Sequence, residues 1–150
     1  MVNIYIDADA CPVKDETVRV ATRHNLKTYM VSDGGIRPSQ NALVELVIVA
    51  QGADAADDWI AEHIGNADIC ITNDIPLAAR CLEKGALAIK PNGERFTENG
   101  IGMALANREL MASLRETGAI TGGPRPFGKA DRSEFLNALE TAVQAANRSR

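Results

Sequence analysis

A chain of 150 residues with 45% hydrophobic and 24% charged residues has the length and composition of one globular domain, which argues against a disordered protein. Its net charge of −4 argues against a generally basic nucleic-acid coat protein, but not against an enzyme that binds phosphates through a few local cations. Three cysteines without a C-x-x-C motif indicate neither a disulfide framework nor a zinc ribbon. With no apolar run of ~20 residues and no basic leader at its start, we expect the protein to be cytoplasmic.

Five short runs rich in β-branched residues alternate with helical patterns over the first 90 residues. We expect strands at residues 2–6, 27–31, 43–50, 67–72 and 86–89, and helices at 12–24, 54–64 and 76–84. Strands that alternate with helices predict βαβ units, a parallel sheet and right-handed crossovers. The expected fold is therefore a three-layer α/β/α arrangement with about five parallel strands in the order 3-2-1-4-5.

Beyond residue 90 the sequence shows helical patterns only. A helix capped by Thr97 runs to Arg108 and continues or restarts over 108–117, and a Gly/Pro-rich loop at 121–130 precedes a last helix at 132–146. No repeat and no linker divides the chain. We expect a single domain over residues 1–150, with a core at about 1–90 and a helical C-terminal portion at about 97–146.

Aspartates follow the strands that should meet at the centre of this sheet. Strands one and four are neighbours in the order 3-2-1-4-5, and ligands bind such sheets outside the carboxyl ends of the strands at this point. Asp7 and Asp9 leave strand one, and Asp74 leaves strand four. The crossover after strand three brings Asp54 and Asp57 to the same edge. The topology therefore predicts a cluster of carboxylates from three separate segments.

Carboxylates packed together repel one another, so they require a cation or raised pKa values. Hard oxygen ligands without a Cys/His set favour Mg²⁺ or Mn²⁺, which complete their coordination with water and substrate phosphate. This is the chemistry of metal-dependent phosphodiester hydrolysis. A simpler alternative is that Asp9, Asp54 and Asp74 only cap helices. Capping does not account for Asp7, and the convergence of Asp7 with Asp74 favours function.

Several basic residues lie in loops that should reach the same edge and could bind a phosphate backbone. Solvated loop charge is the alternative interpretation for each of them. The candidates are Arg37 after strand two, Arg95 after strand five, and Arg125, Lys129 and Arg132 in and after the Gly/Pro-rich loop.

Four sequence strings resemble the YaiI/YqxD family of bacterial proteins over nearly the whole chain. They are D-A-D-A-C-P at 7–12, D-A-A-D at 54–57, I-T-N-D-I-P-L-A at 71–78 and G-G-P at 122–124. This family in turn resembles the PIN/NYN-like nucleases, whose α/β/α fold carries acidic residues after strand one, near a middle helix and after strand four. The resemblance implies one PIN-like domain in which Asp7, Asp57 and Asp74 bind the metal, with Asp9 and Asp54 close by.

The function expected from these observations is hydrolysis of single-stranded RNA with Mg²⁺ or Mn²⁺, in which Asp9 aligns the attacking water. One alternative is a phosphatase of the haloacid-dehalogenase type, with Asp7 as nucleophile, Asp9 as general acid, and Thr72 and Lys90 on the phosphate. That chemistry needs a further acidic pair after Lys90, which the sequence lacks. The other alternative is a non-catalytic RNA- or protein-binding member of the fold.

Overall fold

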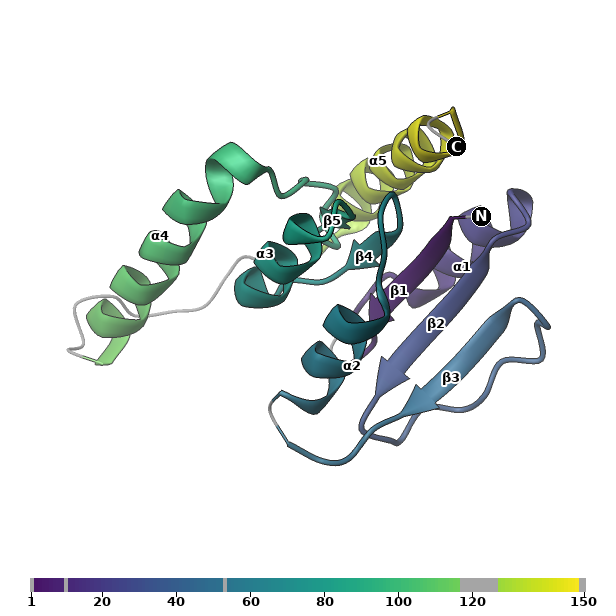
Figure 1. Ribbon diagram of the computed structural model, residues 1–150, viewed down its shortest axis with the longest axis horizontal. Coiled ribbons are helices and arrows are strands. Elements are labelled where there is room, and N and C mark those ends of the chain that lie inside the picture. The colour runs from purple at the N-terminus through teal and green to yellow at the C-terminus, as the bar shows by residue number, and fades with distance from the viewer. Residues whose placement is uncertain (1, 10, 53, 117–126, 149–150) are drawn as a thin grey trace.

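The computed structural model describes residues 2–9, 11–52, 54–116 and 127–148. One parallel sheet of five strands, in the order β3-β2-β1-β4-β5, forms its centre (Figure 1). The strands are β1 (Asn3–Asp7), β2 (Lys27–Ser32), β3 (Val44–Ile48), β4 (Ile69–Ile71) and β5 (Leu87–Ile89). The helices are α1 (Lys14–Arg23), α2 (Ala55–His63), α3 (Ile75–Glu83), α4 (Glu98–Glu116) and α5 (Lys129–Arg148). The predicted α/β fold and strand order are confirmed.

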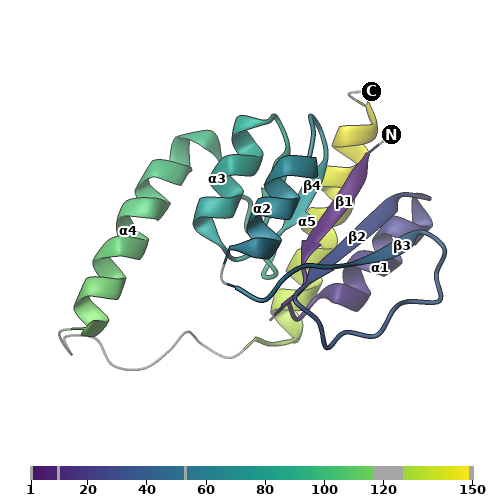
Figure 2. The same cartoon turned by 60° about the horizontal axis from the view of Figure 1, so that its bottom comes forward.

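Helices cover both faces of the sheet because the strands are apolar on both sides. Alternate residues of β1 point in opposite directions, so Ile4 and Ile6 pack in one core cluster and Tyr5 in another. The first cluster includes side chains of α1 and α5, and the second includes side chains of α2 and α3. The three layers are visible in Figure 2, where α2 and α3 lie on one side of the strands and α1 and α5 on the other.

The C-terminal portion consists of two long helices, as the sequence predicts. The patterns on either side of Arg108 belong to a single helix, α4, which packs against α3 and stands at the outside of the molecule (Figure 1). The last helix, α5, is built into the core through Phe135 and Leu139, which are fully buried. Within the described residues, no helix is long and apolar enough to cross a membrane.

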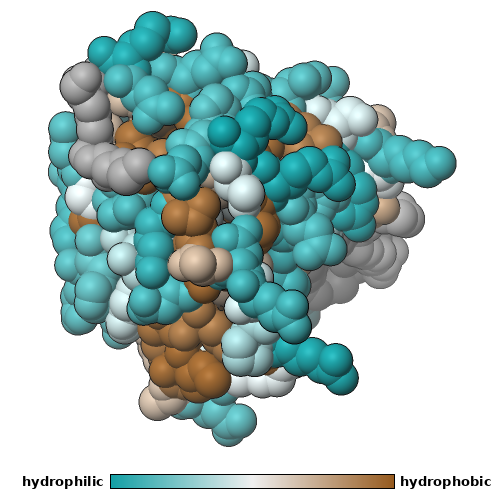
Figure 3. Space-filling model, turned by 90° about the vertical axis from the view of Figure 1, so that its right-hand side faces the viewer, coloured by the Kyte–Doolittle hydropathy of each residue, from teal (hydrophilic) through white to brown (hydrophobic). Residues whose placement is uncertain are grey.

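The strand β3 forms one edge of the sheet and is less covered than the central strands. Its residue Ile48 is 65% exposed, whereas Ile4 and Ile71 on the central strands are fully buried. Seen from this side, apolar residues form a band between polar ones (Figure 3). The central strands β1 and β4 are covered on both faces, and the candidate site lies where their carboxyl ends meet.

Candidate functional site

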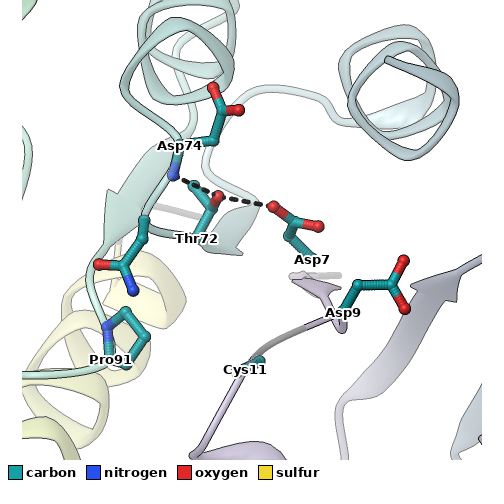
Figure 4. Close-up of a pocket in the computed structure, with 7 residues that line it drawn as sticks. Asp7, Asp9, Cys11, Thr72, Asp74 and Pro91 are labelled. Atoms are coloured by element: carbon teal, nitrogen blue, oxygen red, sulfur yellow. Dashed lines mark hydrogen bonds between the residues drawn. The ribbon is translucent and has the colours of Figure 1, made fainter. Parts of the chain in front are cut away.

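The carboxyl ends of β1 and β4 lie side by side. Ile6 pairs with Ile71 in the parallel register, which places Asp7 next to Thr72 where the two strands end. A pocket of about 300 Å³ opens at this point. It is lined by Asp7, Asp9, Cys11, Thr72, Asn73, Asp74 and Pro91, most of which are labelled in Figure 4. The predicted convergence of the segments after strands one and four is therefore present.

A short chain of hydrogen bonds connects the two central aspartates (Figure 4). The hydroxyl of Thr72 donates to Oδ2 of Asp7 at 3.0 Å and accepts the backbone N–H of Asp74 at 2.9 Å. Asp74 also caps α3, because its Oδ1 accepts the N–H of Leu77 at 2.9 Å. The capping interpretation of Asp74 is thus correct, but the cap engages only one of its two carboxylate oxygens.

Burial and the charges of neighbouring carboxylates raise the pKa of two carboxyl groups at this site, those of Asp7 and Asp57. Burial, reinforced by the charges of Asp74 and Asp9, raises the pKa of Asp7, although the hydrogen bond from Thr72 opposes the shift. Burial and the charges of Asp74 and Asp7 raise the pKa of Asp57 on α2 to about 7. The carboxyl of Asp57 also lies within hydrogen-bonding reach of Asp74, and the charge of Asp54 adds to the same shift. A bound cation would offset this repulsion and favour the ionised forms of Asp7 and Asp57.

The donor set fits Mg²⁺ or Mn²⁺ better than a softer metal. Within the described residues, no three His, Cys, Asp or Glu side chains are grouped closely enough to hold a metal ion together. A pair suffices for Mg²⁺, which is usually bound by one or two carboxylates and otherwise by water and substrate phosphate. The carboxyl groups of Asp57 and Asp74 lie within hydrogen-bonding reach of each other, so they are the candidate pair. Asp7 as third ligand stays a prediction.

Two further aspartates lie near the cluster in different arrangements from those expected. Asp9 lines the pocket, but its carboxylate is turned towards β2, where it accepts the hydroxyl of Ser32 at 2.7 Å and the N–H of Asp33 at 3.1 Å. Asp9 therefore joins two loops, and its orientation does not favour alignment of a water beside Asp7. Asp54 stands at the N-cap position of α2 but makes no side-chain capping bond, so the capping interpretation of Asp54 is wrong.

The predicted phosphate-binding cations are dispersed. Arg37 is exposed in the loop after β2, and Lys129 is exposed at the start of α5. Arg125 lies outside the described residues. The expectation that Arg95 lies at the acidic edge is wrong, since the chain reverses after β5 and pairs Arg95 with Ile89. Its side chain lines a separate pocket with residues that precede β4 and β5.

The guanidinium of Arg132 is engaged in contacts between helices and has a structural role. Its guanidinium donates to the carbonyl of Pro12 at 2.6 Å and to Glu16 at 2.8 Å, and it lies 5.0 Å from the ring of Phe127. These contacts attach α5 to the start of α1 and compete with phosphate binding. The predicted phosphate-binding role of Arg132 is therefore not favoured.

Sequence reasoning missed Lys14, whose ammonium group lies beside the acidic loop. It donates to the carbonyls of Cys11 at 2.8 Å and Ala8 at 3.5 Å. Its position three residues after Cys11, in the first turn of the following helix, is the only sequence signal for this contact. Asn73 was missed as well, although it lies between Thr72 and Asp74 and brings an amide donor into the pocket.

Replacing Asp57 with asparagine should change how the melting temperature depends on pH. Because the pKa of Asp57 is about 7 in the folded protein and 3.8 in the unfolded chain, folding takes up a proton between these values. The stability that this group contributes is fully present below pH 3.8 and is lost as the pH rises through about 7. In EDTA, we expect thermal melting of wild type to drop from pH 5 to pH 8 more steeply than that of Asp57→Asn.

Asp58→Asn is the matched control on the same helix. Asp58 is exposed and pairs with Arg80 at 2.8 Å, and exposed pairs contribute about 1 kcal/mol or less. This variant should retain the wild-type pH dependence. Equal slopes for wild type and Asp57→Asn would contradict the raised pKa of Asp57.

The comparisons with known proteins agree with the resemblance seen in the sequence. Residues 5–145 match the family described as "Uncharacterized BCR, YaiI/YqxD family". A UPF0178 protein of Parvibaculum lavamentivorans is 59% identical over 99% of this chain and 97% of its own length. UPF0178 proteins of Rhodopseudomonas palustris and Roseobacter denitrificans are 57% and 58% identical, over 100% and 97% of this chain and 95% and 97% of their own lengths. No solved structure gives a significant match. The chain therefore belongs to the YaiI/YqxD family.

Proposed function

We propose that the protein is a nuclease that hydrolyses phosphodiester bonds of single-stranded RNA with Mg²⁺ or Mn²⁺. The metal would bind at the acidic pocket, which is the pocket lined by Asp7, Asp9 and Asp74. One observation carries this proposal: Asp7 and Asp74, from the ends of β1 and β4, line one pocket and are connected through the hydroxyl of Thr72. Asp57 on α2 lies close enough to both that their charges contribute to raising its pKa. Such a cluster is unfavourable without a counter-charge, and carboxyl groups with a raised pKa beside a cleft are candidates for a functional site.

Asp57 and Asp74 would hold the cation, and Asp7 would contribute through the waters bound to it. When bound, a divalent ion offsets the charge of these carboxylates, polarises a phosphoryl group and lowers the pKa of an attacking water. Thr72 is a positioning residue, since its hydroxyl connects Asp7 with the backbone of Asp74 and fixes the orientation of the Asp7 carboxylate. The side-chain amide of Asn73 can donate to a non-bridging phosphate oxygen without adding negative charge.

The RNA backbone requires cations outside the pocket, because the acidic cluster repels a polyanion. Arg37 and Lys129 are exposed and belong to loops or helix starts. Lys14 adds a third positive charge directly beside the loop that follows β1. Arg125 belongs to the same proposed set. These residues would bind phosphates on either side of the bond that is cleaved.

Cleavage of a labelled single-stranded RNA by the purified protein tests this proposal. We expect products with Mn²⁺ or Mg²⁺ and none with EDTA. Asp57→Asn should reduce the rate by about tenfold or more, because the loss of groups that support a metal site typically reduces metal affinity or activity 10- to 100-fold. Asp58→Asn, one residue further along α2, should cleave at the wild-type rate. An inactive wild type with both metals, on RNA and on DNA, would contradict the nuclease proposal.

The phosphatase alternative has weaker support in the geometry. Its general acid would be Asp9, but both oxygens of that carboxylate are engaged by Ser32 and Asp33. Its phosphate-binding lysine would be Lys90, which pairs with Glu94 at 3.2 Å and lies over the ring of Phe96. Fluoroberyllate trapped on Asp7, with turnover of a phosphate monoester but not of RNA, would favour the phosphatase.

A further inference from the structure

A second pocket lies between α1 and the loop that follows β2. Its volume is about 320 Å³, at the small end of the range of ~300–1,000 Å³ for ligand sites. Val18, Met30 and Ile36 contribute apolar surface, and Lys14, Arg37 and Asp15 contribute charge. The volume suits one small, partly flat ligand rather than an extended chain.

The segment between β1 and α1 separates this pocket from the acidic pocket. Lys14 lines the second pocket, and its ammonium group is bound to the carbonyl of Cys11, which lines the first. The other end of the same segment is anchored by Asp9 to Ser32, at the end of the strand that carries Met30. The two pockets therefore lie on either side of this segment, which hydrogen bonds fix near both of its ends.

The composition of the second pocket matches that of a nucleotide site. Nucleobases need an apolar surface on which to lie, and a guanidinium plane can stack on them as an aromatic ring does. Met30 and Ile36 give such a surface, and Arg37 is exposed and makes no hydrogen bond or ion pair with any part of the chain that the structure describes. The ammonium of Lys14 has three N–H donors, of which two are directed to the carbonyls of Cys11 and Ala8, so one remains for a phosphate oxygen.

The carboxylate of Asp15 should influence which nucleobase binds in the pocket. A carboxylate only accepts hydrogen bonds, so it can pair with the exocyclic amine of cytosine, whereas uracil has a carbonyl at that position and offers only its ring N3–H. Asp15 lies in the first turn of α1, next to Lys14, and is exposed at the pocket. A base with an exocyclic amine should therefore be favoured.

We propose that this pocket binds the nucleotide next to the phosphodiester that is cleaved, with the base on Met30 and Ile36 and the phosphate on Lys14 and Arg37. The assignment of the pocket to a neighbouring nucleotide rests on the proposed nuclease function. Because of Asp15, we expect the pocket to bind cytidine more tightly than uridine.

Nucleotide binding, measured without any cleavage, tests the proposal. Cytidine 5′-monophosphate is titrated into ¹⁵N-labelled wild type in EDTA, and uridine 5′-monophosphate and ribose 5-phosphate are titrated in parallel. We expect amide shifts at Lys14, Asp15, Ile36 and Arg37. Ribose 5-phosphate should bind at least about fivefold more weakly, because stacking of one base contributes at least that factor. Arg37→Ala and Ile36→Ser should each weaken cytidine monophosphate binding about tenfold.

Arg19→Ala is the control, because Arg19 is exposed on the same helix and does not line the pocket. It should bind like wild type. Equal affinity for ribose 5-phosphate, or no shifts at this pocket, would refute the nucleotide site even if the protein cleaves RNA. Shifts at the pocket in a protein that cleaves no phosphodiester would instead contradict the proposed function and leave the nucleotide site intact. Because Ile36 is partly buried, Arg37→Ala decides the result if Ile36→Ser does not fold.

Discussion

Asp7→Asn should abolish RNA cleavage while leaving RNA binding unchanged or tighter. The carboxylate of Asp7 is central to the pocket and contributes to the charge that raises the pKa of Asp57. We expect the rate to drop by more than about 100-fold, since even residues that only support metal ligands contribute about 10- to 100-fold. Removing one negative charge also reduces the repulsion of the RNA backbone. Cleavage rates and fluorescence anisotropy on one RNA oligomer measure both effects.

The same substitution should raise the melting temperature in EDTA at pH 8. Burial raises the pKa of Asp7, so an ionised Asp7 destabilises the folded protein at that pH. Asparagine keeps an oxygen that can accept the hydrogen bond from Thr72. Higher stability together with lost cleavage indicates a site that trades stability for function. A lower melting temperature with weaker RNA binding would show instead that Asp7 is a structural residue.

Gly93→Ala should destabilise the fold by about 2–4 kcal/mol, through backbone strain and a clash. Gly93 lies in the turn after β5, where its φ of +94° is unfavourable for any residue with a Cβ atom. An added Cβ would lie 2.7 Å from the backbone carbon and oxygen of Glu134 on α5. The turn and α5 would therefore have to separate. Urea unfolding of the variant and of wild type measures the difference.

Gly35→Ala separates the two causes. Gly35 has a φ of +77°, but an added Cβ would meet nothing within 4 Å. Backbone strain alone should reduce its free energy of unfolding by about 1 kcal/mol. If both variants lose the same amount, the close approach of Gly93 to α5 contributes nothing.

The sheet could be predicted because its determinants are local. Alternating strands and helices fix parallel pairing, and the preferred topology then brings Asp7 and Asp74 to one edge. To predict that Asp7 and Asp74 are close, it is enough to know which strands are neighbours. The position of these two residues could therefore be predicted from the sequence alone.

Side-chain directions and chain reversals could not be predicted in the same way. The carboxylate of Asp9 is directed by the hydroxyl of Ser32, a contact 23 residues away in the chain. Arg95 leaves the acidic edge because the backbone between Lys90 and Glu94 turns back, with Lys90 N–H donating to the Glu94 carbonyl at 2.8 Å. Arg132 is engaged by Glu16, a residue of another helix. Each of these outcomes depends on tertiary contacts that no spacing rule encodes.

The helix α5 packs on the first strand, β1, from which it is separated by most of the sequence. Phe135 and Leu139 of α5 belong to the same core cluster as Ile4 and Ile6 of β1, and all four are fully buried. The core on one side of the central strand is therefore completed by a helix that lies far beyond the last pocket residue, Pro91, in the sequence. We expect chains truncated before α5 to be sensitive to proteases and to have no assembled site.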